Sequence, residues 1–161
     1  AGLGPGRPRV VLTALDAPPP LPIPLEPESA SRARILFLTP TELKSEGRVL
    51  HEPRFDVVFA RARDRVSQLR SLYQDGPLDL DFRAMGERSR AVQLVRCSIQ
   101  KTGSDRQSSR TGQRHSLAGF TGEAEYAGEM GEFLPILRAA AWTGIGRHTP
   151  WGLGAVQVEA A

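Results

Sequence analysis

The sequence predicts an α+β domain in which an antiparallel sheet carries helices on one face. Three observations support this fold class. Segments typical of strands and helices follow one another in the order strand, helix, strand, strand, helix, strand. Glycine or proline separates most of these segments. Hydrophobic residues make up 40% of the 161 positions and aromatic residues only 6%, so a core of adequate size must consist mainly of Leu, Val, Ile and Ala.

The first predicted strand is Arg34–Leu43, with four consecutive apolar residues and a bend or edge at Pro40. A turn follows, and Pro53 then opens a helix, because proline is favoured in the first turn. Apolar residues recur at helical spacing as far as Leu72, and Gly76 with the next proline ends the helix.

The second half contains the remaining predicted elements. They are a short helix near Leu80–Arg88, a strand at Ala91–Ile99, a strand at Gly119–Tyr126, a helix at Gly131–Ala141 and a closing strand at Ala155–Val158. This order is the split βαβ, or ferredoxin-like, arrangement: two helices cover one face of an antiparallel sheet. The other face stays free, and folds of this kind often bind RNA there. Glu123 and Glu125 are expected to face solvent.

Residues 1–31 are predicted to lie outside this domain, which then spans residues 32–161. A glycine-rich start at Ala1–Arg9 leads directly into the apolar run Val10–Leu12. The dense prolines of Pro18–Pro27 disfavour both a helix and a central strand. We therefore expect an extended linker there.

Composition excludes some functions and weakly favours others. The formal net charge of +3 is only a slight indication of an anionic partner. Nearly all basic residues are arginines, which suit phosphate recognition, although a genomic bias towards arginine explains this equally well. With Cys97 as the single cysteine, neither a disulfide nor a Cys-based zinc site forms within one chain, and a cytoplasmic location is the simplest interpretation. No apolar run or leader pattern indicates a membrane.

The segment Gly144–Gly154 is the first candidate for function. Four glycines flank Arg147, His148 and Thr149. Glycines allow the backbone to approach a ligand closely, and an arginine beside free amides suits phosphate. The order helix, loop, strand and the missing lysine exclude a nucleotide-binding P-loop. A simple helix-to-strand connection with glycine hinges remains the alternative.

The second candidate is the polar stretch from Lys101 to Ser116. Its basic residues and those beside it are Arg96, Lys101, Arg106, Arg110, Arg114 and His115. Glycine, serine and threonine lie between them, so we expect a mobile loop that follows a phosphate backbone. A solvated hairpin loop is the alternative. The arginines of the first helix, Arg61, Arg63, Arg65 and Arg70, are expected to be merely solvated.

Three histidines and two tryptophans are further candidates. Histidine has a pKa near neutral and so suits acid–base catalysis. No pair of histidines has metal-ligand spacing, so no metal or cofactor site is predicted. For each histidine a non-catalytic role is favoured, and His115 and His148 fit best as RNA contacts. Trp142 and Trp151 flank the glycine-rich segment, where burial is favoured over base stacking.

Three segments together resemble a known family. The Gly-x-Gly and Gly-Leu-Gly motifs within Gly144–Gly154, after a helix and before the last strand, resemble the glycine-rich loop of the RAMP proteins of CRISPR systems. Arg106–Gly122, followed by Tyr126, and Leu36–Lys44 resemble one branch, the repeat-RNA endoribonucleases that form the sixth family of Cas proteins. The resemblance spans about residues 32–161.

This resemblance implies the C-terminal RNA-binding domain of an enzyme that cleaves pre-crRNA through the ribose 2′-OH, without metal. A non-catalytic RAMP scaffold subunit of an effector complex is the alternative. Residues 1–31 would include the tail of a preceding ferredoxin-like domain, where the family's catalytic histidine generally lies. Its position between strand and helix makes His51 the one catalytic candidate here. Repeat RNA is the implied partner, with other Cas subunits as further partners. The implied RNA contacts are Arg106, Arg110, Arg114, His115, Gly144, Gly146, Arg147, His148, Thr149, Gly152 and Gly154.

Overall fold

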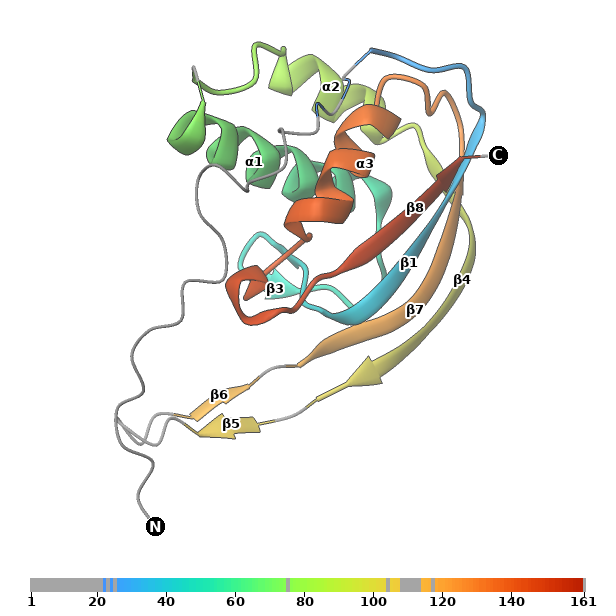
Figure 1. The fold of residues 1–161 in the computed structure, drawn as a ribbon. Helices are drawn as coiled ribbons and strands as arrows, with labels where there is room; N and C mark the ends of the chain where they lie inside the picture. Colours follow the sequence, from blue (N-terminus) through green and yellow to red (C-terminus); the bar gives the residue numbers. More distant parts are fainter. Residues whose placement is uncertain are drawn as a thin grey trace.

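A computed structural model describes residues 22, 24, 26–74, 76–103, 105–107, 114–116 and 118–160. It confirms the α+β, ferredoxin-like fold, with a four-stranded antiparallel sheet in the order β4-β7-β1-β8 (Figure 1). The sheet strands are β1 (Arg32–Thr41), β4 (Gln93–Thr102), β7 (Gly119–Ala127) and β8 (Val156–Ala160). The helices are α1 (Phe55–Tyr73), α2 (Phe82–Ser89), α3 (Leu134–Thr143) and the 3₁₀ turn η1 (Thr149–Trp151). Two short hairpins complete the described part: β2 (Lys44–Ser45) with β3 (Arg48–Val49), and β5 (Asp105–Gln107) with β6 (Arg114–Ser116).

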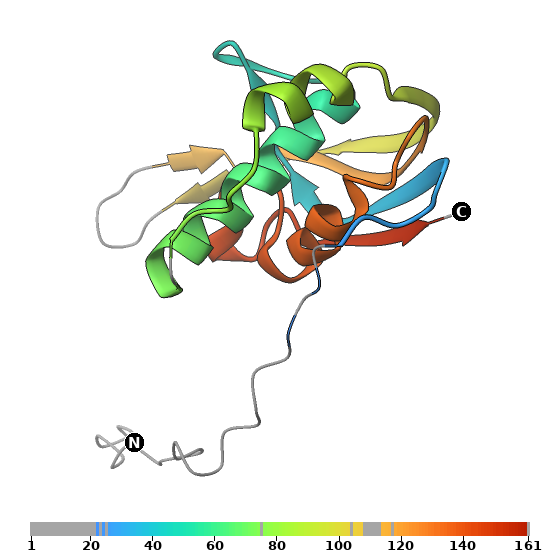
Figure 2. The same ribbon diagram turned by 90° about the horizontal axis from the view of Figure 1, so that it is seen from above.

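Side chains alternate across the sheet and so define its two faces. Ile35 of β1 is fully buried and lies opposite Ala124 of β7 and Val158 of β8. The helices cover this face (Figure 2). Phe55 and Phe59 of α1 pack against Phe133, with ring centroids 5.3 and 4.7 Å apart. These three rings and Tyr126 form an aromatic cluster at the junction of α1, α3 and the sheet.

The first helix begins at Phe55, two residues after the predicted start. Pro53 lies before the helix and contacts the sheet instead. Its buried carbonyl accepts a hydrogen bond of 2.7 Å from the Tyr126 hydroxyl on β7. Burial, with smaller effects of Cys97 and Glu52, raises the pKa of Tyr126 well above its usual range, so the hydroxyl remains a donor at neutral pH. The bond fixes the segment between β3 and α1 against the sheet.

Removing this hydroxyl is expected to destabilise the domain. Tyr126→Phe leaves the buried Pro53 carbonyl without its donor, which costs about 1–2 kcal/mol in the free energy of unfolding. Urea denaturation measures the loss. Tyr73→Phe, at a side chain that is 80% exposed, is the matched control and should change little. Equal stability of the two variants would contradict the assigned role of the Tyr126 hydroxyl.

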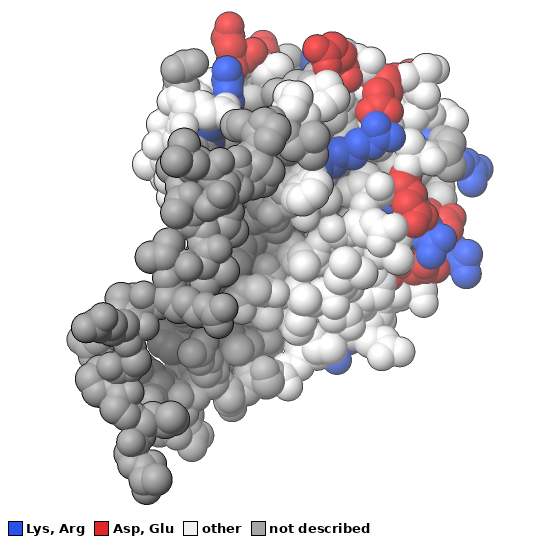
Figure 3. Space-filling view, viewed as in Figure 1, with Lys and Arg blue, Asp and Glu red and all other residues white. Residues whose placement is uncertain are grey.

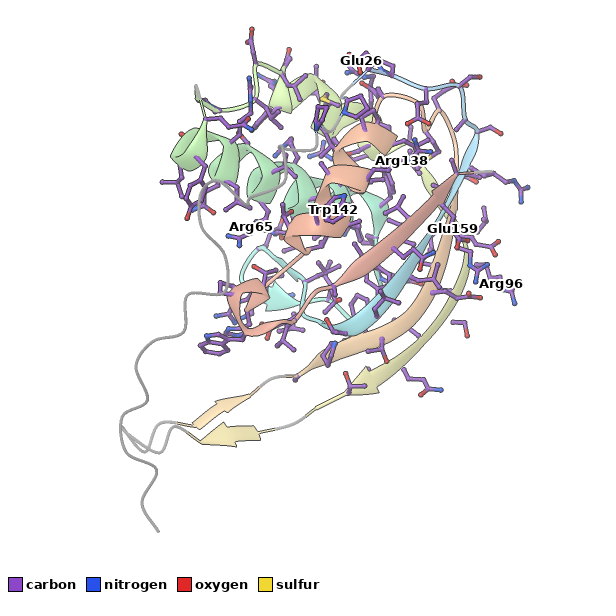
Figure 4. All side chains as sticks on the ribbon, in the orientation of Figure 1. Glu26, Arg65, Arg96, Arg138, Trp142 and Glu159 are labelled. Atoms are coloured by element: carbon purple, nitrogen blue, oxygen red, sulfur yellow. The ribbon has the colours of Figure 1, made fainter. Side chains whose placement is uncertain are left out.

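The uncovered face of the sheet carries ion pairs. Arg34 lies 2.8 Å from Glu123 and 3.6 Å from Glu159, and Arg96 lies 3.6 Å from Glu125. Figure 4 shows Arg96 and Glu159 on the side of the sheet away from the helices. Glu123 and Glu125 do lie on this face, but they pair with arginines across strands. None of the described residues on this face is aromatic.

Candidate functional site

A groove of about 480 Å³ lies at the end of the sheet where β1 gives way to the β2–β3 hairpin. Five separate segments line it: the residues after β1, those between β3 and α1, the end of β4, the start of β7 and the glycine-rich loop. His51, Arg147 and His148, which are far apart in the sequence, meet here. The fold therefore brings together the catalytic candidate and the glycine-rich candidate.

The groove is predominantly basic. Lys44 and Lys101, the only two lysines of the chain, line it together with Arg147. Among the lining residues that the structure describes, Glu42 is the only acidic one. Three permanent cations and two histidines in one hollow favour an anionic ligand with several charges, such as a nucleic acid backbone. Sequence reasoning missed Lys44 and Glu42, because their closeness to Arg147 depends on tertiary pairing.

Backbone hydrogen bonds hold the glycine-rich loop against the end of β1. The N–H of Ile145 donates to the Gly154 carbonyl over 2.8 Å, and the N–H of Gly154 donates to the Pro40 carbonyl over 3.1 Å. Gly144, Gly146, Gly152 and Gly154 all have positive φ. At Gly146 a Cβ would lie 2.6 Å from the Glu42 carbonyl oxygen. The base of the loop is thus packed closely, and its tip reaches the surface.

Glu42 connects this loop to β1 through both its backbone and its side chain. Its carbonyl accepts the Arg147 N–H over 3.2 Å, and its carboxylate accepts from Arg147 Nη1 over 2.8 Å. Lys44 Nζ lies 3.5 Å from the same carboxylate. The Glu42 side chain is only 9% exposed, whereas that of Arg147 is 49% exposed. Glu42 therefore holds one edge of the guanidinium and leaves other donors directed outward.

The tip of the loop has an unusual backbone at His148. This residue has φ of 62°, and its ring stacks on Trp151 with centroids 4.7 Å apart. Thr149 begins the 3₁₀ turn that Trp151 ends. Burial of both tryptophans was the favoured expectation and is wrong: Trp142 is 74% exposed and Trp151 is 46% exposed. Trp142 falls on the outer side of α3 because apolar residues occupy nearly the whole circumference of this short helix (Figure 4).

The basic stretch is partly a β-ladder. Arg106 lies opposite His115, and Gln107 opposite Arg114, in the β5–β6 pair. Figure 1 shows β5 and β6 beyond the ends of β4 and β7. Lys101 and Gly119, at those ends, line the groove, so the hairpin continues from its wall. Arg110 lies outside the described residues.

The arginines of α1 are not merely solvated. Arg61 donates to the Lys44 carbonyl over 2.9 Å and so supports the groove from behind. Arg63 donates to the Phe82 carbonyl over 2.8 Å and lies over the Phe82 ring. Arg70 donates to the Pro77 carbonyl over 2.8 Å. These contacts join α1 to neighbouring loops. Arg65 makes no hydrogen bond through its buried Nε within the described part of the chain.

Within the part of the chain that the structure describes, no three His, Cys, Asp or Glu side chains come together in a group able to hold a metal ion. None of the helices among these residues has the length and apolar character needed to cross a membrane.

Comparisons with known proteins agree with this geometry. The family model described as CRISPR-associated endoribonuclease Cas6 matches residues 35–156. Among solved structures, Thermus thermophilus Cas6 superposes with a TM-score of 0.63 and 22% identity over 83% of this chain and 55% of its own. A product complex of the same Cas6 gives a TM-score of 0.63 and 22% identity, over 83% of this chain and 53% of the matched chain. A partial Cas6-RT-Cas1–Cas2 complex superposes with a TM-score of 0.57 and 11% identity, over 83% of this chain and 23% of the matched chain. No curated protein sequence matches.

Fold and groove define a ferredoxin-like domain with a basic groove closed by a glycine-rich loop. The chain belongs to the Cas6 family of CRISPR-associated endoribonucleases, because the family model covers well over half of it. It spans about half the length of the Thermus structures that it matches.

Proposed function

We propose that this chain is the C-terminal RNA-binding domain of a CRISPR repeat-RNA processing endoribonuclease. In this proposal the protein acts in the cytoplasm, and the groove beside the glycine-rich loop binds repeat RNA. The observation that supports it most directly is the meeting of Lys44, Lys101 and Arg147 with two histidines in one hollow. The solved product complex of a Cas6 supports an RNA ligand, and the Cas6-RT-Cas1–Cas2 complex supports other Cas subunits as partners.

For the full-length protein we propose cleavage without metal. A base removes the proton of the ribose 2′-OH, the oxygen attacks the adjacent phosphorus, and an acid protonates the leaving 5′-oxygen. Arginine or lysine stabilises the charge that develops on the phosphate. His51 is exposed and lines the same groove as Arg147, so it is this chain's candidate for proton transfer. A preceding domain, of which residues 1–31 include the tail, would supply the main catalytic histidine.

The test combines binding and cleavage of a labelled repeat RNA in EDTA. The chain should bind the RNA with an affinity that falls as salt rises, and the full-length protein should yield a cleaved product. Binding without any product would favour the alternative, a non-catalytic scaffold subunit. Absence of salt-sensitive binding would contradict both functions.

Glu42→Gln is expected to strengthen RNA binding. The carboxylate neutralises part of the charge of Arg147 and Lys44, and glutamine keeps its shape without its charge. We expect affinity for single-stranded RNA to rise by roughly 3- to 10-fold at 0.1 M salt, with a salt slope steeper by up to about 0.7. Titrations by fluorescence anisotropy at several salt concentrations measure both quantities.

Glu123→Gln is the matched control for this change, because it removes the same charge from an Arg34 ion pair on the uncovered sheet face. Its affinity should stay near that of the original chain. A rise of the same size in both variants would attribute the effect to net charge and would contradict a specific role of Glu42 in the groove.

A further inference from the structure

The tip of the glycine-rich loop carries a preformed pair of stacked rings. The Trp151 N–H donates to the His148 carbonyl over 2.9 Å and so closes the 3₁₀ turn η1. Side chains three residues apart are eclipsed in such a turn, which brings the imidazole against the indole. The two rings are nearly parallel, at 9°, with centroids 4.7 Å apart. Pro150 lies between the two residues, and its fixed φ stiffens the turn.

The backbone of His148 adopts a conformation that few side chains tolerate. Its φ of 62° lies in the left-handed region, which glycine occupies at no steric cost. Four glycines flank this part of the loop, yet the position itself carries an imidazole. Residues in such sparsely populated conformations cluster at ligand-binding sites. The strained position of the ring therefore points to a contact outside the loop.

The ring pair lies at the basic groove. His148 belongs to the groove lining, next to Arg147, whose side chain is 49% exposed. Trp151 is 46% exposed, so the pair is not part of the core. Val49, which is 45% exposed, adds an apolar surface to the same groove. Exposed rings beside cations are the combination by which proteins bind single-stranded nucleic acid, because the cations bind phosphates and the rings stack on bases.

We propose that the His148–Trp151 pair is a stacking platform for one unpaired base of the RNA in the groove. The inference rests on the proposed function and adds the form of RNA that this site takes. Bases of a duplex stack on their neighbours and are closed to side chains, so the nucleotide at the loop tip is single-stranded. Its base lies on the imidazole face that Trp151 does not cover, and Arg147 binds an adjacent phosphate. Trp151 is the positioning residue that fixes the imidazole.

Two substitutions at His148 separate the ring from the backbone conformation. Asparagine also tolerates a left-handed φ, so His148→Asn removes the ring and retains the turn, whereas His148→Phe retains a ring. Both variants lack the imidazole nitrogens. For an oligoadenylate of about eight nucleotides, His148→Asn should lower the affinity roughly 5- to 20-fold, and His148→Phe should stay within about 2-fold of the original chain. A ribose-phosphate chain of the same length without bases should bind equally to both variants. Anisotropy titrations at one salt concentration measure these affinities.

The two tryptophans of the chain provide an optical test that leaves His148 unchanged. In Trp142→Phe the emission comes from Trp151 alone, so it should fall when the oligoadenylate binds and recover when salt displaces it. In Trp151→Phe the emission comes from Trp142 and should not change. Trp142 suits this control because it lies on the outer side of α3, where Figure 3 shows few charged side chains, and is not among the described residues of the groove lining.

Two outcomes overturn the stacking platform alone. One is an equal affinity of His148→Asn and His148→Phe for the oligoadenylate, and the other is an unchanged Trp151 emission at saturation. In both cases salt-sensitive RNA binding, and with it the proposed function, would remain in place. If the original chain binds neither the oligoadenylate nor repeat RNA, the proposed function fails and the platform fails with it.

Discussion

Replacing Lys44, Lys101 and Arg147 together with glutamine is expected to lower the affinity for repeat RNA by roughly 10²-fold at 0.1 M salt. Each cation that pairs with a phosphate of a single strand contributes about 0.7 to the slope of log K against log salt, so three lost contacts reduce the slope by about 2. The change also leaves Glu42 in the groove without its two cations, and its charge then repels phosphate. Anisotropy titrations over a range of salt concentrations measure both effects.

A matched variant removes three charges elsewhere: Arg32→Gln, Arg83→Gln and Arg90→Gln. None of these arginines lines the basic groove. Net charge falls equally in the two variants, so non-specific attraction falls equally, but only the groove variant should lose most of its affinity. Similar losses in both would mean that RNA binds by overall charge, and the groove would no longer be the assigned site. Thermal melting confirms that each variant is folded.

Gly154→Ala is expected to destabilise the domain by about 3–5 kcal/mol, among the largest effects of a single substitution. The φ angle of Gly154 is 73°, and a Cβ there would lie 2.0 Å from the Ile145 carbonyl oxygen. The same residue makes the two backbone hydrogen bonds that close the glycine-rich loop against β1. The loop must therefore move to admit the methyl group. Urea denaturation measures the loss.

Gly152→Ala separates the two causes of this loss. Gly152 has a similar φ of 82°, but no heavy atom lies within 4 Å of the position of its Cβ. Only the cost of the left-handed conformation remains, about 1–2 kcal/mol. An equally small loss at Gly154 would show that the loop yields easily, and it would remove the argument that close packing fixes the position of Arg147.

The fold was predictable because its signals are local. β1 contains a run of four apolar residues, apolar residues recur at helical spacing in α1, and glycine or proline separates most of the elements. The start of the first helix differs from the prediction because a long-range contact competes with the local preference of proline for the first turn. Pro53 accepts a hydrogen bond from Tyr126, 73 positions away, so the helix starts after it. No local pattern in the sequence reveals such a contact.

The site was predictable only in part. Glycines around a single arginine indicated the loop, and Arg147 does lie at a groove. Its partner Glu42 is 105 residues away in the sequence and depends on the pairing of the loop with the end of β1. The exposure of Trp142 was missed for a different reason: hydrophobicity alone does not tell which side of a short, almost wholly apolar helix remains outside.

The continuation of β4 and β7 into the β5–β6 hairpin has a geometric consequence. Residues of a strand alternate between its two sides, so inserting one residue into each arm of the hairpin would turn every later side chain to the opposite side. Two inserted residues per arm preserve the orientation and lengthen each arm by about 7 Å. The ladder can thus be extended without reversing its two faces only in steps of two residues per arm.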